Sequence, residues 1–339
     1  ALAAITGNVG VAGGGVHSDT SAGRTDLDWS WLERAPKGRF RKVLLPHLGT
    51  AITETKDPPL QMGWIAGANP AATCPNTSRV RAGLRSLGFV VAVEQFMTAS
   101  AAEADVVLPC TTYLEMEDLS VAYGHHWLGL SQQVVAPLGE ARSDVAIYQA
   151  LAARLGFGRQ LAGEPAQWID KLLAPLAGRG ITRDALAERS LPNPAIEPVP
   201  FLDGRFRTPS GKVDLCAADP GNPPVLGPGQ LQLMATKSLD MVNSQINADD
   251  LPAEPVAKIH PATLARLGFE PDSRVWVVSA VGRIRARLVA DETTRAEVLE
   301  LNPAAWRGDL EGVNQLREPT LADLGQAAAL HETRVRLER

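Results

Sequence analysis

The clearest alternation of hydrophobic and polar positions lies between residues 61 and 109. Gln61 to Ala66 is a short apolar run that ends at Gly67. Apolar residues then recur at the spacing of one helical face: Val80, Leu84 and Leu87. Phe89 to Val93 is a continuous apolar run, as expected for a strand that is buried on both faces. The pattern predicts a strand, a helix and a second strand, joined by a right-handed crossover in a parallel sheet.

A pattern of period two begins after a stretch rich in proline and glycine. Residues 220–229 contain four prolines and three glycines, which is typical of a linker. Beyond it, apolar residues alternate with polar ones in short segments: Leu231, Leu233, Val275, Val277, Ile284, Ala286, Leu288, Val298 and Leu301. Short strands joined by turns predict a small β-barrel. We therefore expect an α/β domain over residues 1–219, the linker over 220–229 and a barrel domain over 230–339.

Two shorter stretches predict local structure between these regions. Ser143 and Asp144 suit the cap and first turn of a helix that ends at Gly156. Its apolar face is expected to carry Ile147, Leu151 and Leu155. Residues 206–215 suit a turn between two short strands.

Composition and charge narrow the classes of function. The chain has 339 residues and a net charge of −5, and its 33 basic residues are interspersed with 38 acidic ones. This balance argues against a nucleic-acid surface, and no run approaches the roughly 18 apolar residues of a transmembrane helix. The three cysteines, Cys74, Cys110 and Cys216, and the six histidines have no spacing typical of a metal or iron–sulfur site. We assign no metal ligand and no catalytic residue in this sequence.

The loop after the first predicted strand is a candidate nucleotide site. In open α/β sheets, ligands bind beyond the carboxyl ends of the strands, where loop amides and a helix N-terminus face an anion. Gly67 allows close backbone approach there, and Asn69 can form a side-chain turn. Either Asn76 or Thr77 can cap the following helix. Glu94, which ends the second strand, can accept hydrogen bonds from a ribose diol or a guanine edge.

The generic signal leaves an alternative open. The chain has no G-x-G-x-x-G pattern and no P-loop lysine, so an ordinary strand–helix–strand unit without a ligand fits the same residues.

The same region resembles a known family. Residues 91–109 read VAVEQFMTASAAEADVVLP, and together with Gly67 to Pro70 they resemble the molybdopterin oxidoreductases of the dimethyl sulfoxide reductase and formate dehydrogenase type. Ile5 to Gly15 and residues 259–291 extend the resemblance into both halves of the chain. The family has aspartate more often than glutamate where Glu94 stands, so the charge is kept and the reach is longer.

The resemblance implies a fold, a cofactor and site residues. The fold class is α/β, with a Rossmann-like parallel-sheet domain followed by a double-psi β-barrel domain. The cofactor is molybdopterin guanine dinucleotide with molybdenum or tungsten. The expected cofactor contacts are Gly67, Asn69, Pro70, Thr73, Glu94, Thr98, Pro109, Cys110, Asp144, Thr236, Lys237, Ser238, Asn243, Ser244 and Asn314. The alternative role is a plain helix cap for Asp144 and a turn residue for Asn243 and Asn314.

Nearly the whole chain resembles the C-terminal portion of the family. We therefore expect a fragment of a molybdopterin-dependent oxidoreductase that is inactive alone. Its first partners would be the missing N-terminal domains, which would carry the molybdenum ligand and any iron–sulfur cluster. A small-molecule substrate and an electron-transfer subunit are the other expected partners. The cytoplasm is the favoured location, with the periplasm as the second option.

Two other functions stay open at this point. One is a structural or electron-chain subunit that keeps the fold without the cofactor, and the other is a generic nucleotide-binding α/β module. The polar residues retained at Asn69, Glu94, Asp144 and Asn314 favour a cofactor site over the first alternative. The second alternative predicts that nucleotide binding survives removal of everything after Asp219.

Overall fold

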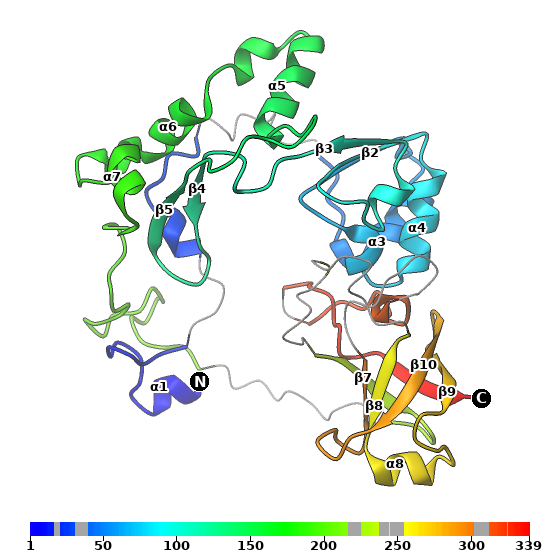
Figure 1. The fold of residues 1–339 in the computed structure, drawn as a ribbon. Helices are drawn as coiled ribbons and strands as arrows, with labels where there is room; N and C mark the ends of the chain where they lie inside the picture. The colour runs from blue at the N-terminus through cyan, green and yellow to red at the C-terminus, as the bar shows by residue number, and fades with distance from the viewer. Residues whose placement is uncertain are drawn as a thin grey trace. The chain divides into compact units, whose positions relative to one another are not determined.

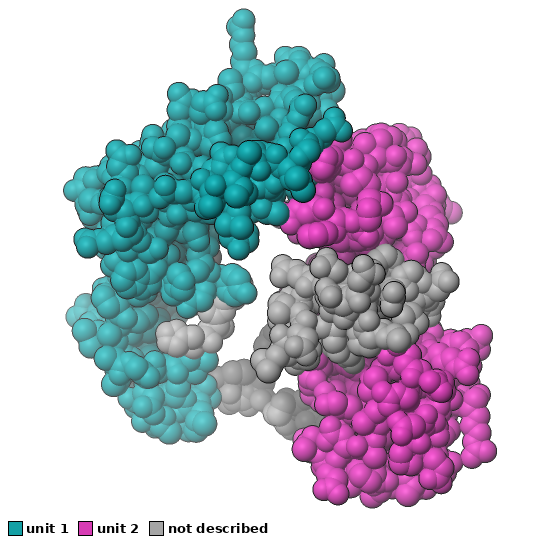
Figure 2. Space-filling view, viewed as in Figure 1, with its two compact units in different colours: residues 1–39, 110–222 teal, residues 40–109, 223–339 magenta. Residues whose placement is uncertain are grey.

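The computed structural model describes residues 1–16, 21–30, 40–215, 225–236, 244, 254–301, 312–323 and 325–339. The chain forms two compact units, Ala1–Arg39 with Cys110–Asn222 and Phe40–Pro109 with Pro223–Arg339 (Figure 2). The second unit takes residues from both expected domains, and the expected domain boundaries stay a prediction. Among the described helices, none has the length and apolar character needed to cross a bilayer.

The first unit combines helices with a small antiparallel sheet (Figure 1). Its elements are α1 (Leu2–Ile5), η1 (Ser21–Arg24), β4 (Asp118–Val121), β5 (Trp127–Ser131), α5 (Asp144–Arg154), η4 (Gly158–Leu161), α6 (Pro165–Ala177), α7 (Arg183–Glu188) and β6 (Leu191–Pro192). The strands pair in the order β4, β5, β6. Leu119 and Leu128 of this sheet share a core with Leu173 of α6 and Leu186 of α7. The sheet and these two helices therefore form the hydrophobic centre of the unit.

Local predictions in the first unit are confirmed only in part. Helix α5 begins where expected, because the Ser143 hydroxyl accepts a hydrogen bond from the Ala146 amide at 3.2 Å. Its buried side chains are Ile147 and Ala152, whereas Leu155 is 61% exposed, so the predicted apolar face is wrong at Leu155. Residues 206–215 form a turn but neither of the two expected strands.

In the second unit, the first half is a parallel sheet covered by helices. Its elements are η2 (Leu45–His47), α2 (Leu48–Glu54), β1 (Met62–Ala66), α3 (Pro70–Thr73), α4 (Thr77–Ser86), β2 (Phe89–Glu94), η3 (Ala101–Glu103) and β3 (Val106–Pro109). The strands lie in the order β1, β2, β3, with Trp64 opposite Val91. Helices α2 and α4 pack together, and Val80 of α4 shares a core with Val90 of β2. The predicted strand, helix and parallel strand are confirmed.

The other half of this unit is a closed barrel. Its elements are β7 (Leu231–Ala235), β8 (Val256–Ile259), α8 (Pro261–Arg266), β9 (Arg274–Val278), β10 (Arg283–Ala290), β11 (Val298–Leu301), η6 (Val313–Gln315) and β12 (Arg334–Glu338). The strands close in the order β10, β8, β11, β7, β12, β9. Along β10, Ile284, Ala286 and Leu288 are buried, while Arg283 and Arg285 are exposed. The period of two therefore predicted the barrel and its inward face correctly.

Candidate functional site

The loop after β1 is held by the loop that follows β2. Gly67 has a φ of +59°, in the left-handed region that favours glycine. The Asn69 Oδ1 accepts hydrogen bonds from the Ser100 amide at 3.2 Å and the Ser100 hydroxyl at 2.7 Å. The Ser100 Oγ also accepts the Ala71 amide at 3.0 Å. The side-chain turn expected at Asn69 is therefore wrong, because its side chain ties together two loops at the carboxyl ends of adjacent strands.

The same loop leads into α3 and then α4. Pro70 is buried at the first position of α3, where no backbone donor is needed. The Thr73 hydroxyl donates to the Asn69 carbonyl at 2.9 Å. Asn76 caps α4, because its side chain accepts a hydrogen bond from the Arg79 amide at 3.3 Å. Of the two caps considered, the structure selects Asn76.

Glu94 organises the loop at the end of β2. Its Oε1 accepts the Gln95 amide at 2.8 Å, and its Oε2 accepts the Thr98 hydroxyl at 3.3 Å. Pro109 stands opposite Glu94 in the β2–β3 register. Three predicted cofactor residues, Glu94, Thr98 and Pro109, are thus neighbours at one edge of the sheet. The half-buried carboxylate still has lone pairs for a ligand, because each of its oxygens can accept more than one hydrogen bond.

Cys110 and Asp144 belong to the first compact unit. Cys110 forms a parallel bridge with Arg142, and Asp144 is the first residue of α5. Ser143 is the side-chain cap, which excludes the plain cap role for Asp144. Burial raises the pKa of Asp118, and the nearby Asp144 carboxylate raises that pKa further. A nucleotide contact by Cys110 or Asp144 stays a prediction.

The barrel residues predicted to contact the cofactor are described only in part. Lys237, Ser238 and Asn243 lie outside the described residues. Thr236 follows β7, and its hydroxyl donates a hydrogen bond to the Glu300 carboxylate of β11. Ser244 is half-buried in a turn. A role in cofactor binding stays a prediction for this group.

Asn314 connects the barrel to the loop after β1. It is 6% exposed within η6, and its Nδ2 donates to the Ala72 carbonyl of α3 at 2.7 Å, across 242 positions of sequence. Its Oδ1 accepts a hydrogen bond from Arg317 Nη1 at 2.9 Å. The Arg317 carbonyl in turn accepts the Asn76 amide at 3.0 Å. The structure therefore brings Asn314 to the segment Asn69–Thr73, although these predicted residues come from opposite ends of the unit's sequence.

Arg317 is a candidate that the sequence did not reveal. Its side chain is buried, with the residue 6% exposed, and its Nε has no hydrogen-bond acceptor among the described residues. Burial lowers the pKa of this arginine to about 10. An arginine between a leucine and a glutamate usually indicates a solvated surface. No pattern in the chain therefore distinguishes Arg317 from the exposed arginines.

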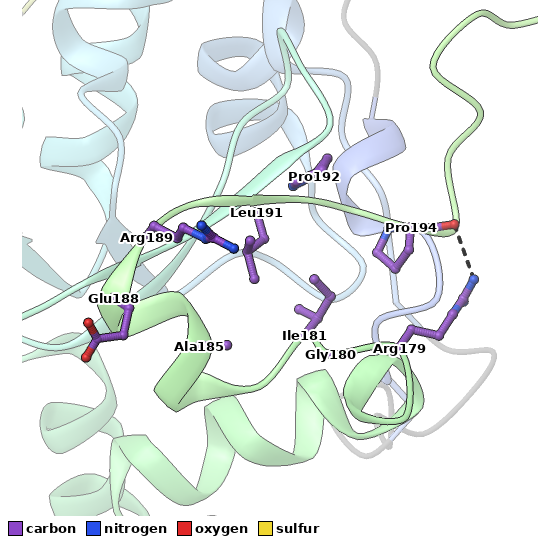
Figure 3. A pocket seen from close by; sticks show the side chains of 9 residues that line it. All are labelled: Arg179, Gly180, Ile181, Ala185, Glu188, Arg189, Leu191, Pro192 and Pro194. Atoms are coloured by element: carbon purple, nitrogen blue, oxygen red, sulfur yellow. Dashed lines mark hydrogen bonds between the residues drawn. The ribbon is translucent and has the colours of Figure 1, made fainter.

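A shallow hollow in the first unit contains none of the predicted cofactor residues. Figure 3 shows its lining, between α7 and the segment that follows β6, with a volume of about 540 Å³. Arg179 Nη1 donates to the Pro194 carbonyl at 3.3 Å at one side of the hollow. The remaining charged lining residues are Glu188 and Arg189. Since none of the predicted contacts lines this hollow, we do not assign the cofactor to it.

Comparison with known proteins accounts for most of the chain. The molybdopterin oxidoreductase model matches residues 1–154. The molydopterin dinucleotide binding domain model matches residues 231–334, which include most of the barrel.

Two similar curated proteins illustrate the extent of the match. The probable oxidoreductase YyaE of Bacillus subtilis is 27% identical over 367 residues, covering 100% of this chain and 54% of the relative. The F420-dependent formate dehydrogenase subunit alpha of Methanocaldococcus jannaschii is 31% identical over 175 residues, covering 46% of this chain and 26% of the relative. The chain thus spans about half the length of the first of these relatives.

A solved structure agrees on the fold. Acetylene hydratase from Pelobacter acetylenicus superposes with a TM-score of 0.70 at 22% identity, covering 95% of this chain and 50% of that chain. At this identity the similarity shows the fold alone. The two matched models, and the YyaE match that covers 100% of this chain and 54% of the relative, show that the chain belongs to the molybdopterin oxidoreductase family.

Proposed function

We propose that this chain is the cofactor-binding C-terminal portion of a bis(molybdopterin guanine dinucleotide) oxidoreductase that uses molybdenum or tungsten. In this proposal the parallel sheet is Rossmann-like and the closed barrel has the double-psi topology. The parallel pairs β10–β8 and β11–β7 within an otherwise antiparallel barrel are compatible with that topology.

The observation that carries the proposal is the hydrogen bond from Asn314 to the Ala72 carbonyl. It joins η6, in the region that the dinucleotide binding model matches, to α3, which follows the loop that begins at Gly67. A ligand that contacts both needs an extended, polar structure with groups for amide and backbone partners. A pterin dinucleotide has this character, whereas a simple nucleotide bound by the sheet alone would not need Asn314.

The donors of this region also suit an anionic ligand. The guanidinium of Arg317 is buried, and its Nε finds no acceptor in the described part of the chain. The N-terminus of α4 carries a partial positive charge and is capped by Asn76, whose amide donates to the Arg317 carbonyl. A cofactor with a pyrophosphate linker would supply the missing negative charge.

The residues of the chain have distinct roles in this proposal. Glu94 accepts hydrogen bonds from the guanosine end, and Asn314 offers its remaining amide hydrogen to the pterin. Asn69 and Ser100 hold the loop in place. The bound cofactor supplies the redox electronics, and the protein supplies binding, orientation and exclusion of water.

The proposed reaction is a two-electron oxidation, a reduction or an oxygen-atom transfer on a small substrate. Two relatives support this proposal by their names. One is the F420-dependent formate dehydrogenase subunit alpha, and the other is trimethylamine-N-oxide reductase 1 of Escherichia coli, which is 40% identical over 110 residues. The chain covers 54% of the relative YyaE. In this proposal, further domains of the same protein would complete the metal site. The chain alone should therefore have no turnover, and any iron–sulfur cluster would belong to those domains.

Expression of the whole gene in cells that make the cofactor tests this function. We expect purified protein to contain molybdenum or tungsten and to release guanine nucleotide on denaturation. A well-folded product that lacks both would refute the proposal and leave the cofactor-free subunit. A chain truncated after Asp219 that binds guanosine diphosphate with unchanged affinity would instead support the generic nucleotide-binding module.

A further inference from the structure

One side of the barrel carries arginine side chains on three neighbouring strands. Strand β9 pairs with β10 on one side (Figure 1) and with β12 on the other. Residues that alternate with the buried core positions of these strands point outward. The charged residues among them are Arg274, Arg283, Arg285, Arg287, Arg334, Arg336 and Glu338. This surface, which we call the arginine face, has six cations and one anion in a chain whose net charge is −5.

At one end of the arginine face, the cations are neutralised by nearby carboxylates. Glu254 pairs with the Arg274 Nε at 2.8 Å and with the Arg287 Nε at 3.1 Å. Arg287 Nη1 also donates to Asp272 at 2.7 Å. Arg274 and Arg287 are direct cross-strand partners, and like charges in such positions destabilise a sheet. Glu254 bridges the two arginines and so removes most of this repulsion.

The rest of the arginine face has no such compensation in the described part of the chain. Arg283, Arg285 and Arg336 are exposed, and no carboxylate of a described residue forms an ion pair with any of them. Arg283 and Arg336 stand on the two sides of Val278 in the strand register. Two strand spacings are roughly 10 Å, which is close to one Debye length at physiological salt. These cations therefore repel one another in the folded protein.

An aromatic side chain lies at the centre of this uncompensated part. Trp276 is half-buried and stands between Arg285 of β10 and Glu338 of β12. The guanidinium carbon of Arg283 lies 4.6 Å from the centroid of the Trp276 ring, which is a cation–π contact. Tryptophan and arginine are the residue types that are enriched among the residues with the largest contributions to protein–protein binding.

The opposite side of the same barrel has a different charge pattern. Glu300 of β11 stands opposite Lys258 of β8, and the Lys258 Nζ lies 3.4 Å from the Asp291 carboxylate. Cross-strand pairs of opposite charge stabilise a solvated sheet surface. Contact with water therefore explains why outward residues are charged, but it does not explain why those of the arginine face have one sign.

We propose that the arginine face is a docking surface for an acidic protein partner, with Trp276 at its centre and with Arg283, Arg285 and Arg336 as contacts for carboxylates. Guanidinium groups bind carboxylates through two parallel hydrogen bonds, and complementary charge accelerates association and excludes other partners. Glu338 favours a protein over a nucleic acid or an anionic membrane. A uniform polyanion repels this carboxylate, whereas a protein surface also has cations that can pair with it. This inference does not depend on the proposed function.

Fluorescence anisotropy of a labelled synthetic peptide tests the proposal. The peptide alternates glutamate with leucine and has one lysine at its centre. We expect it to bind the wild-type protein with an affinity that falls as the salt concentration rises. Arg285→Gln should weaken binding about threefold to fivefold, as expected for one exposed ion pair, and the combined Arg283→Gln, Arg285→Gln and Arg336→Gln variant should lose most of it.

The matched control is Arg266→Gln, which removes an exposed arginine of α8 in the same barrel. It should bind the peptide as the wild type does, and all variants should melt close to the wild-type temperature. No binding of the peptide to the wild-type protein would overturn the proposal. An equal loss of affinity in Arg266→Gln and Arg285→Gln would also overturn it, because the effect would then come from net charge.

Glu338 separates a protein partner from other occupants. A peptide with glutamate in place of the central lysine should bind the wild type more weakly, and Glu338→Gln should remove this preference. Tighter binding of single-stranded DNA or phosphatidylserine vesicles than of the lysine-containing peptide, with the same dependence on the three arginines, would overturn the protein assignment. A salt-sensitive dimer that the combined variant abolishes would overturn it as well, by identifying a second copy of the chain as the occupant.

Discussion

Two buried charged side chains in the second unit, Glu103 and Arg317, differ in the charge of their hydrogen-bond partners. The Glu103 side chain is 4% exposed and accepts hydrogen bonds from Arg81 Nε at 2.7 Å and Arg85 Nη2 at 2.7 Å. Arg317 is buried to a similar degree, yet its described partners are a neutral amide and backbone groups. Both residues contact α4 or its cap: Glu103 bonds Arg81 and Arg85 of the helix, and the Arg317 carbonyl accepts the amide of the cap residue Asn76.

The difference in partners indicates whether each charge stabilises the fold or is available to a ligand. Glu103 joins η3 to α4 through a closed ion cluster, so its contribution is complete when the chain has folded. Among the described residues Arg317 has no counter-charge, so under the proposed function its energy would depend on the ligand. A buried charge therefore points to a ligand only when the fold leaves it without its counter-charge.

The largest expected effect on stability comes from removing the charge of Glu103, which pairs with Arg81 and Arg85. Glu103→Gln should lower the free energy of unfolding by about 2 kcal/mol, because Arg81, which is 26% exposed, loses a buried charge-assisted partner, although Arg85, which is 62% exposed, can rehydrate. Urea denaturation measures this loss. Glu54→Gln is the control, since its pair with Arg79 is solvent-exposed and should contribute less than about 0.5 kcal/mol. Equal effects at the two positions would contradict the comparison.

A smaller effect on stability is expected at Asn314, which bonds the buried Arg317. Asn314→Ala should lower the free energy of unfolding by about 1–2 kcal/mol, because the Ala72 carbonyl and the Arg317 guanidinium each lose a hydrogen bond. In an Arg317→Met background the cost should be smaller, since one of the two bonds is already absent. A double-mutant cycle with urea denaturation gives this coupling, and strict additivity would show that the two side chains do not act together.

A third carboxylate, Glu94, should affect ligand binding, and its replacement should also lower stability because the Gln95 amide and the Thr98 hydroxyl lose their acceptor. Glu94→Ala should weaken binding of guanosine diphosphate about tenfold, or ~1.4 kcal/mol, through loss of one charge-assisted hydrogen bond. Isothermal titration measures this, with inorganic pyrophosphate as the matched ligand whose affinity should not change. Superimposable guanosine diphosphate titrations for the variant and the wild type would show that the guanosine end binds elsewhere.

The smallest expected effect is the pH dependence of the stability that Glu103 contributes. Burial alone would raise the pKa of Glu103, but hydrogen bonds and charge from Arg85 and Arg81 outweigh it and hold the pKa below its ordinary 4.5. The unfolded chain then binds the proton more readily, so the stabilisation is present above pH 4.5 and is lost as pH falls through the folded-state pKa. The stability difference between wild type and Glu103→Gln should therefore narrow on acidification. A difference that stays constant down to acidic pH would mean that charge is not its cause.

Sequence patterns predicted the elements of this fold better than their contacts. Residues 89–93 predicted a strand because a strand buried on both faces has a continuous apolar run. The alternation around Ile284 predicted a strand because a strand buried on one face alternates apolar and polar residues. Leu155 was predicted to be buried because helical spacing indicates a shared face, but spacing cannot show whether another element covers that face. The turn at residues 208–211 formed without its strands, since turn residues do not specify a partner strand.

The site was harder to predict than the fold for a related reason. The loop after the first strand pointed to Gly67 and Asn69, and the family resemblance pointed to Asn314 as well. The hydrogen bonds that place Asn69 and Asn314, to Ser100 and Ala72, join distant parts of the sequence. Arg317 left no signal because burial and charge compensation are properties of the folded surroundings. Residue types alone could not reveal that one arginine has no counter-charge among the residues that the structure describes.

The tie between Asn69 and Ser100 has a consequence for the thermodynamics of binding. A loop that is already fixed by three hydrogen bonds among Asn69, Ala71 and Ser100 loses its conformational entropy when the protein folds. A nucleotide that binds beside it meets a preorganised surface and does not have to order the chain. Ser100→Ala should therefore make the binding entropy of guanosine diphosphate less favourable while the binding enthalpy changes little, since Ser100 itself need not touch the ligand.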